Sequence, residues 1–314
     1  MYKFIWVLVC VVLLAISFCG CSSNKSDLKP SSKIKVVASL FPQYDFAKQI
    51  AKDKADVSLL LPPGTESHTF DPSPQDILNI SNSDVFLYTG KEMEPWADKI
   101  IGSVKNNNLI VCNVSEGIEL KKNVAHSNHL HNHDGHYEHN FDPHIWLDPT
   151  LAIKMVDNIT ATFCQKDPQN EEYYKNNAKE YKKKLSDLDV SFKSMIASSK
   201  RHSIVFSGRF AHLYFINRYK LDYMSAYDSC STEAEPSVKK ISEVIIFIKR
   251  NNIPAIYYEE FTEPKIAKSI SEQTGAKPLK FSTLHNVTKE QLESNSTYID
   301  LMLENLENLR QGLN

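Results

Sequence analysis

Histidines are the residues of this chain whose number and spacing point most directly to chemistry. Seven of the eleven lie in one short segment, HSNHLHNHDGHYEHNFDPH. Neutral imidazole is a preferred ligand of zinc and similar ions, and His-rich tracts bind metal loosely. The alternative is a polar loop that binds no metal. Because no apolar residues would pack this segment into one rigid site, we expect it to act as an auxiliary metal loop, made of His126, His129, His131, His133, His136 and His139.

Tight binding would have to come from histidines that a folded core holds in place. His68 lies in PPGTESHTFDP after an apolar run, and His144 lies in DPHIWLDP. His285 follows the last predicted strand, in TLHN. In open α/β sheets ligands bind beyond the carboxyl ends of the strands, so two lobes could bring these histidines to one shared cleft. A single histidine in such a position more often has a structural role.

The elements that would position these histidines alternate between strand and helix. In the first half we expect strands at 34–41, 57–61, 85–88 and 109–112, with helices at 44–53, 74–82 and 94–104. In the second half we expect strands at 203–206, 221–227, 255–258 and 278–281, with helices at 210–218, 236–251, 263–274 and 297–312. This alternation predicts an α/β fold of two lobes, each a mostly parallel sheet flanked by helices.

A different pattern separates the two halves. Residues 149–199 contain no glycine, and apolar residues recur at three- and four-residue steps from Tyr173 to Ile196. This spacing predicts an amphipathic helix of roughly 30 residues, about 45 Å long, that joins the lobes rigidly. A coiled-coil dimer is the alternative, but the steps are too irregular for a heptad repeat, so we expect a monomer. The predicted organisation is an N-terminal lobe at 33–165, a linking helix at 166–199 and a C-terminal lobe at 200–314.

The N-terminal segment has the features of an export signal. An apolar run from Phe4 to Phe18 is too short for a comfortable membrane span and fits a signal-peptide core. Gly20 precedes Cys21, as in a bacterial lipobox, and a polar stretch follows. We therefore expect residues 1–21 to be a lipoprotein signal peptide, Cys21 to carry the lipid and 22–32 to be a tether. This places the protein outside the cytoplasm on a bacterial membrane; an ordinary secretory signal is the alternative.

Composition excludes several functions. The chain is 42% hydrophobic and 24% charged, with a formal net charge of −2, so no basic excess could neutralise nucleic-acid phosphates. No Gly-rich phosphate loop is present. Beyond the export segment, Cys112, Cys164 and Cys230 are widely spaced and odd in number, which predicts neither a disulfide framework nor a cysteine metal clip.

Several segments resemble one known family. PPGTESHTFDPSPQD, DPHIWLDP and the C-terminal TYIDLMLENLENLRQGL are similar to signature segments of the metal-binding solute receptors of ABC transporters, the cluster A-I proteins that serve zinc and manganese. The resemblance covers nearly all of residues 33–314. It implies two α/β lobes joined by one rigid helix, a metal held between the lobes by four side chains, a permease as partner and no enzymatic activity.

The resemblance also implies which residues bind the metal. His68 and His144 match the first two ligand positions, and His285 falls on or near the fourth, where manganese proteins usually carry Asp. The third position falls on Arg209, which stays protonated and cannot bind a metal. His212 is a candidate substitute, although a packing role in its helix is at least as common.

The expected site is therefore His68, His144 and His285, completed by a carboxylate or by water. Glu233, Glu259 and Glu260 all follow predicted strands, so any of them could supply the carboxylate. We include Glu260 in the candidate set; each glutamate alone would more often be a salt-bridge or capping residue.

Ligand chemistry favours zinc as the transported ion. Three imidazoles with at most one carboxylate suit tetrahedral Zn²⁺, whereas Mn²⁺ favours more oxygen ligands. A manganese receptor of the same type is the first alternative. A secreted zinc hydrolase is another, with Glu259 or Glu260 as base, but no HExxH or Gly-x-Ser-x-Gly motif is present. A lipoprotein adhesin or a structural zinc scaffold could also use this fold.

Overall fold

The computed structural model describes residues 33–123, 141–227, 236–261 and 263–314. The predicted signal peptide and tether with Cys21, the six histidines of the auxiliary loop, Cys230 and Glu233 lie outside these ranges. The description below concerns the unit Ile34–Asn314 by itself.

The first sheet comes from the N-terminal half of the chain. Its strands are β1 (Ile34–Ala38), β2 (Ala55–Leu59), β3 (Val85–Tyr88) and β4 (Ile110–Asn113), all parallel and in the order β2-β1-β3-β4. Helices α2 (Phe41–Ala51), α3 (Pro74–Ser81) and α4 (Ala97–Ser103) connect them. The two central strands are almost continuously apolar, as expected of parallel strands covered on both faces.

The second sheet repeats this arrangement. Its strands are β5 (Ser203–Phe206), β6 (Asp222–Ser225), β7 (Ala255–Tyr258) and β8 (Lys277–Lys280), all parallel and in the order β6-β5-β7-β8. Helices α7 (Leu213–Tyr219), α8 (Val238–Asn251) and α9 (Lys265–Thr274) connect them. Two parallel sheets flanked by helices confirm the predicted fold class.

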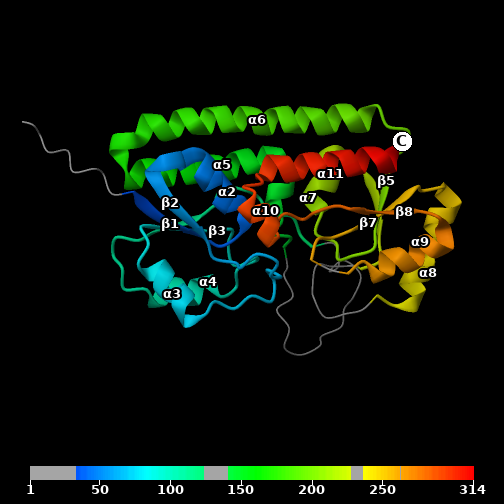
Figure 1. Ribbon diagram of the computed structural model, residues 1–314, viewed down its shortest axis with the longest axis horizontal. Coiled ribbons are helices and arrows are strands. Elements are labelled where there is room, and N and C mark those ends of the chain that lie inside the picture. The colour runs from blue at the N-terminus through cyan, green and yellow to red at the C-terminus, as the bar shows by residue number, and fades with distance from the viewer. Residues whose placement is uncertain (1–32, 124–140, 228–235, 262) are drawn as a thin grey trace, which may run out of the picture. The chain divides into compact units, whose positions relative to one another are not determined.

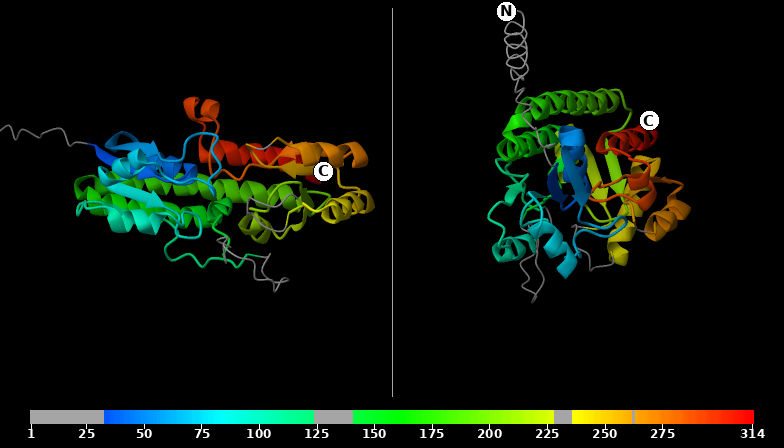
Figure 2. Two further views of the ribbon diagram at one scale, coloured as in Figure 1. Left: turned by 90° about the horizontal axis from the view of Figure 1, so that it is seen from below. Right: turned by 60° about the vertical axis from the view of Figure 1, so that its left-hand side comes forward.

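Long helices join the two sheets along one side. Figure 1 shows α6 (Glu171–Ala197) running past both sheets, with α5 (Pro149–Lys166) and α11 (Tyr298–Leu313) between it and the strands. The 27 residues of α6 span about 40 Å, which confirms a long linking helix. α11 contacts α6, α2 and the strands β5, β7 and β8, so it joins the two halves as well. Figure 2 shows the same layering from two other sides.

The largest hydrophobic cluster continues from one sheet to the other. It includes Phe46 near the first sheet, Phe192 on α6 and Phe281 near the second sheet. Tyr298 at the start of α11 adds a polar connection, because its hydroxyl donates to the backbone oxygen of Trp146 and its backbone N–H donates to Asp45. The two lobes therefore share one core along their helical side.

Several element boundaries differ from the prediction for local reasons. Residues 149–199 form two helices, because Pro168 disfavours helical backbone at Asp167, whose φ of −136° and ψ of 71° end α5. α2 begins at Phe41, earlier than expected, with Pro42 in the first turn, where its missing N–H costs nothing. α7 begins only at Leu213, which leaves 207–212 as a loop.

The short helix α10 (Lys289–Glu293) was not expected. Thr288 and Gln291 form a capping box at its start, and the Thr-x-x-Gln spacing is the sequence signal for it.

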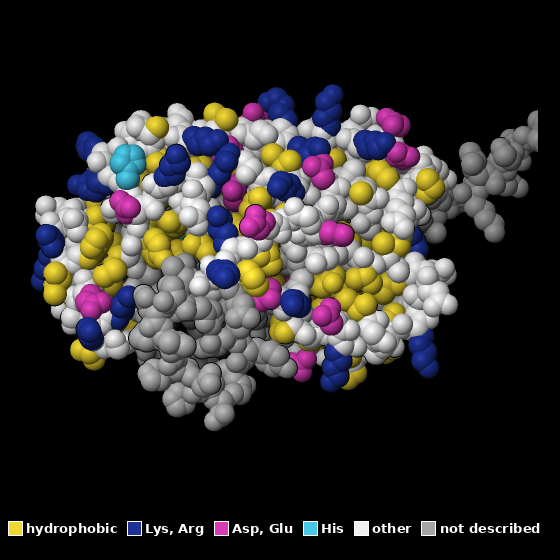
Figure 3. Space-filling view, turned by 180° about the vertical axis from the view of Figure 1, so that it is seen from behind, with side chains coloured by type: hydrophobic (Ala, Val, Ile, Leu, Met, Phe, Trp, Pro, Cys, Tyr) yellow, Lys and Arg dark blue, Asp and Glu magenta, His cyan; other side chains and the backbone are white. Residues whose placement is uncertain are grey.

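The surface carries charges of both signs. On the face shown in Figure 3, Lys and Arg side chains alternate with Asp and Glu, and hydrophobic side chains fill the spaces between them. None of the helices in the described ranges combines the length and the apolar sequence needed to cross a bilayer.

Candidate metal centre

Four histidines lie in loops that follow the carboxyl ends of strands. His68 follows β2, and His144 lies beyond β4, directly before a short 3-10 helix at Ile145–Leu147. In the second half, His212 lies between β5 and α7, and His285 follows β8. Each sheet thus contributes two imidazoles at the end where parallel α/β sheets bind ligands.

His68 and His144 already face one another. Their Nε2 atoms are 3.3 Å apart, although 76 residues separate them in the chain. In a tetrahedral zinc site with Zn–N distances of about 2.0–2.1 Å, two ligand nitrogens are separated by about 3.3–3.4 Å. The pair therefore has the spacing of two adjacent zinc ligands.

The ring of His144 is held by a carboxylate two residues before it. His144 Nδ1 lies 2.9 Å from Asp142 Oδ1, which also accepts a hydrogen bond from the His144 backbone N–H at 2.8 Å. An ionised carboxylate only accepts, so Nδ1 carries the proton and Nε2, which faces His68 Nε2, keeps its lone pair. This is the carboxylate–histidine arrangement that orients metal ligands. Both side chains are buried.

His285 is held by a similar chain of contacts with one more member. The Thr283 hydroxyl donates to Glu260 Oε1 at 2.7 Å, so its oxygen accepts the proton of His285 Nδ1. His285 Nε2 is buried and has no hydrogen-bond partner within the described ranges. The ring is therefore in the tautomer that can bind a metal through Nε2.

Glu260 organises the loop that carries His285. It accepts hydrogen bonds from the backbone N–H groups of Thr283, at 2.8 Å, and of Leu284, at 3.0 Å. Leu284 has a φ of 58°, a left-handed backbone that non-glycine residues seldom adopt without support. Three hydrogen bonds to Glu260 support this turn, which gives Glu260 a positioning role beside His285.

His212 is fully buried in an aromatic box. Its ring stacks on Phe206, with centroids 4.6 Å apart, and meets Phe281 edge-on at 5.0 Å. Burial and, secondarily, the nearby His144 lower the pKa of His212 to about 3, so the ring is neutral. Neither ring nitrogen has a partner with hydrogen-bond geometry in the described part of the chain, although the nearby Phe281 backbone acts to raise the pKa of the ring. An unpartnered buried imidazole is costly, and metal binding would explain it.

Glu259, another of the glutamates that could have supplied the carboxylate, is buried next to these loops. Burial raises its pKa well above the usual range, Glu260 and Glu66 raise it further, and Arg209 lowers it. A buried carboxylate with a raised pKa is a poor anionic ligand near neutral pH.

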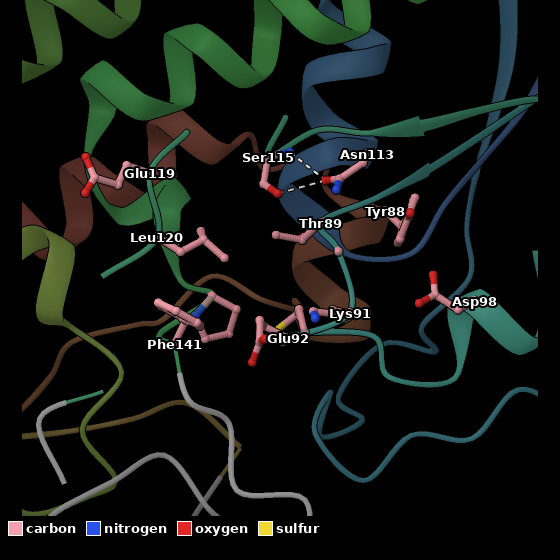
Figure 4. Close-up of a pocket in the computed structure, with 13 residues that line it drawn as sticks. Tyr88, Thr89, Lys91, Glu92, Asp98, Asn113, Ser115, Glu119, Leu120 and Phe141 are labelled. Atoms are coloured by element: carbon pink, nitrogen blue, oxygen red, sulfur yellow. Dashed lines mark hydrogen bonds between the residues drawn. The ribbon is translucent and has the colours of Figure 1, made fainter. Parts of the chain in front are cut away.

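Only part of the candidate centre is assembled. Across residues 33–123, 141–227, 236–261 and 263–314, no three His, Cys, Asp or Glu side chains form a complete coordination group. The His68–His144 pair is thus the preformed part, and the rings of His212 and His285 come from the opposite sheet. A cavity of about 570 Å³ lies elsewhere, at the ends of β3 and β4. Figure 4 shows it lined by Tyr88, Asn113 and Phe141, and it contains none of the four histidines.

Comparison with known proteins places this geometry in a family. Residues 36–312 match the family model described as the periplasmic component A of a zinc-uptake complex. The chain belongs to this family. Members are solute-binding components of uptake systems rather than enzymes, and two parallel-sheet lobes are their fold.

Relatives of this zinc-uptake component cover almost the whole chain. It is 35% identical over 307 residues to the high-affinity zinc uptake system protein ZnuA of Bacillus subtilis, covering 97% of this chain and 96% of that protein. It is 32% identical to the zinc-binding lipoprotein AdcA of Streptococcus pneumoniae, covering 95% of this chain but only 59% of AdcA. The chain thus spans about three fifths of the length of its streptococcal AdcA relatives.

Solved structures agree with this family assignment. The metal-dependent lipoprotein YcdH of Bacillus subtilis matches with a TM-score of 0.76 and 34% identity, over 90% of this chain and 99% of that one. The laminin-binding protein Lmb of Streptococcus agalactiae, described as an adhesin with metal-transporting activity, matches with a TM-score of 0.76 and 28% identity, over 90% of this chain and all of that one.

Two groups of site residues were missed or undervalued in the sequence. The resemblance placed the third ligand position on Arg209 and left His212 as a candidate substitute; the lack of partners at its ring nitrogens is visible only in the folded structure. Asp142 and Thr283 were not singled out, although each lies two residues before a candidate histidine. That Asp-x-His and Thr-x-His spacing is the signal that could have identified them.

Proposed function

We propose that this chain captures one zinc ion between its two lobes through His68, His144, His212 and His285, and delivers it to the permease of an ABC importer. The observation that carries the proposal is the His68–His144 pair, whose Nε2 atoms stand 3.3 Å apart. Membership in a zinc-uptake family and relatives named as zinc-binding proteins support the choice of cargo.

The donor set supports zinc over manganese. Four neutral imidazoles would complete a tetrahedral shell, which Zn²⁺ accepts and Mn²⁺ disfavours, because Mn²⁺ prefers oxygen ligands and higher coordination. Burial keeps the ring of His212 neutral by lowering its pKa to about 3. A manganese receptor of the same type is the alternative that the same titration tests.

Binding in this proposal has an order. The ion first meets the preformed pair from the N-terminal lobe, and His212 and His285 then complete the shell from the other lobe. Glu260 acts as the group that positions His285 and does not bind the metal itself, since its oxygens already accept three hydrogen bonds.

The test is a competition titration of residues 22–314 against a zinc chelator. His68→Ala, His144→Ala, His212→Ala and His285→Ala should each weaken zinc binding by more than about a hundredfold, because direct ligands matter more than the groups that orient them. His202→Ala, at an exposed position, is the matched control and should bind as the unaltered protein does. Unchanged affinity in both His212→Ala and His285→Ala would reject the four-histidine site.

The His-rich segment is proposed to hold further zinc weakly. Deleting residues 126–139 should remove the weak binding and leave one tight site. If calorimetry shows the tight site disappearing with the segment, the assignment to the four core histidines is wrong.

Attachment to the membrane through lipid on Cys21 is also proposed, supported by relatives named as lipoproteins. Cys21→Ala should release the protein from the membrane or leave its signal uncleaved, whereas Cys19→Ala should be tolerated because Gly20 still precedes Cys21. A lipid found on Cys19 by mass spectrometry would contradict this. We propose that the protein works as a monomer with its permease.

A further inference from the structure

An ion pair crosses between the two loops that carry candidate ligands. Arg209 Nη1 lies 3.5 Å from Glu66 Oε2, and both side chains are about three-quarters buried. Glu66 comes from the loop after β2, and Arg209 comes from the loop between β5 and α7. The contact therefore links the His68 loop of one lobe to the His212 loop of the other.

Glu66 is tied directly to the His68 backbone. Its Oε1 accepts a hydrogen bond from the His68 N–H at 3.2 Å, while its Oε2 faces Arg209. The carboxylate thus belongs to a residue two positions before a candidate ligand and is hydrogen-bonded to that ligand's backbone. Whether the Glu66 carboxylate can bind the same ion depends on its other contacts.

Arg209 stands among several carboxylates. Besides Glu66, its charge acts on Glu259, lowering a pKa that burial and two other glutamates raise. Glu259 also packs against the backbone beside Arg209, since a Cβ placed on Gly208 would lie 3.0 Å from Glu259 Oε1. The positive charge of Arg209 thus acts on two acidic side chains next to the metal loops.

We propose that Arg209 is a specificity-determining residue, which keeps the carboxylate of Glu66 out of the metal's coordination shell and so leaves the ion to imidazoles alone. This rests on the proposed function. The physical reason is competition, because a carboxylate paired with a fixed cation is less available to a second cation. Oxygen ligands favour Mn²⁺ over Zn²⁺, so excluding them sharpens the preference for zinc.

The experiment compares Zn²⁺ and Mn²⁺ affinities of the whole exported chain by competition titration. Arg209→Ala should lower the ratio of zinc to manganese affinity at least tenfold, mainly by strengthening manganese binding. Arg209→Lys keeps the charge and should restore most of the ratio. The double variant Arg209→Ala with Glu66→Gln should restore it too, because the released carboxylate is gone. Arg201→Ala, whose guanidinium instead donates to the Asn314 backbone oxygen, is the control.

A spectroscopic measurement separates this role from a structural one. With Co²⁺ as the probe, the unaltered protein should show the intense visible bands of a four-coordinate ion, and Arg209→Ala should show the weaker bands of higher coordination. An unchanged affinity ratio and spectrum in folded Arg209→Ala would overturn the inference. Failure of the unaltered protein to bind zinc through its histidines would instead overturn the proposed function.

Discussion

At the residue scale, an acidic side chain orients the ring of both His144 and His285 for metal binding, but through different contacts. Asp142 touches the His144 ring directly, whereas Glu260 reaches His285 through the Thr283 hydroxyl. In both cases an acid fixes the proton on Nδ1 and leaves Nε2 free. At these two residues the tautomer that can bind a metal is therefore set before an ion arrives.

Removing the acid behind His144 should weaken metal binding without removing a ligand. Asp142→Asn leaves the ring in place but no longer selects its tautomer, so zinc affinity should fall by about 10- to 100-fold. Asp157→Asn, which changes an exposed partner of Lys182, is the control and should have no effect in the same chelator competition. Wild-type affinity in Asp142→Asn would show that the hydrogen bond does not orient His144 for the ion.

A second buried acid predicts a pH dependence of stability. Burial raises the pKa of Glu94 to about 7, despite hydrogen bonds from the Ser39 hydroxyl and the Thr89 and Gly90 backbones. The folded state therefore holds this proton more tightly than the unfolded state, in which the pKa is about 4.5. The stability that Glu94 contributes is fully present below about pH 4.5 and is lost as the pH rises through about 7.

Glu94→Gln should remove this loss. Between pH 5 and pH 8, the free energy of unfolding of the unaltered protein should fall by about 2–3 kcal/mol relative to that of the variant. Urea denaturation at both pH values measures the difference. Glu116→Gln, at an exposed position, should follow the unaltered protein at both. A difference that does not change with pH would mean that Glu94 stays ionised in the folded state.

The sequence could predict which residues are candidates for the site, but it could not predict what surrounds each of them in the fold. His68, His144 and His285 were identifiable because each follows a strand and lies in a distinctive segment. The neutrality and isolation of His212 depend on Phe206, the last residue of β5, and on Phe281, the residue directly after β8. No local pattern around His212 contains that information.

At the scale of elements, strands were easier to predict than helix starts. β3 and β7 begin and end where their apolar runs do, as predicted, because buried parallel strands are read directly from hydrophobicity. α2, α5 and α7 differ from the prediction at ends set by proline or loop geometry, which hydrophobic periodicity does not record. The alternation of elements was sufficient for the fold class.

The link between α6 and α7 gives a prediction of its own. Asp189 on α6 accepts two hydrogen bonds from Arg218 on α7, at 2.9 and 2.7 Å, and its carboxylate is largely buried. Asp189→Ala leaves Arg218 without this partner and should lower the free energy of unfolding by about 2 kcal/mol. Asp187→Ala is the matched control on the same helix; its ion pair with Lys183 is exposed, so its effect should stay within about 0.5 kcal/mol. Equal effects in urea denaturation would contradict the prediction.

At the scale of the whole molecule, the four candidate ligands come from four different quarters of the chain. An unfolded chain cannot hold them together, so the proposed tight site exists in the folded state alone, and zinc bound there should stabilise that state. At a free zinc concentration a hundredfold above Kd the gain is about 2.7 kcal/mol, which should raise Tm by about 5 °C or more. Scanning calorimetry of residues 22–314 with zinc and with chelator measures this, and His144→Ala should show no such shift at the same zinc concentration.

The helices α6 and α11 have a mechanical consequence for how cargo is signalled. Because both helices pack along the two sheets, the lobes resist bending relative to one another. We therefore expect metal binding to cause small shifts in the loops around the ion and no large rearrangement of the two lobes. A permease that distinguishes the metal-bound protein from the metal-free one would then have to contact the loops around the site directly.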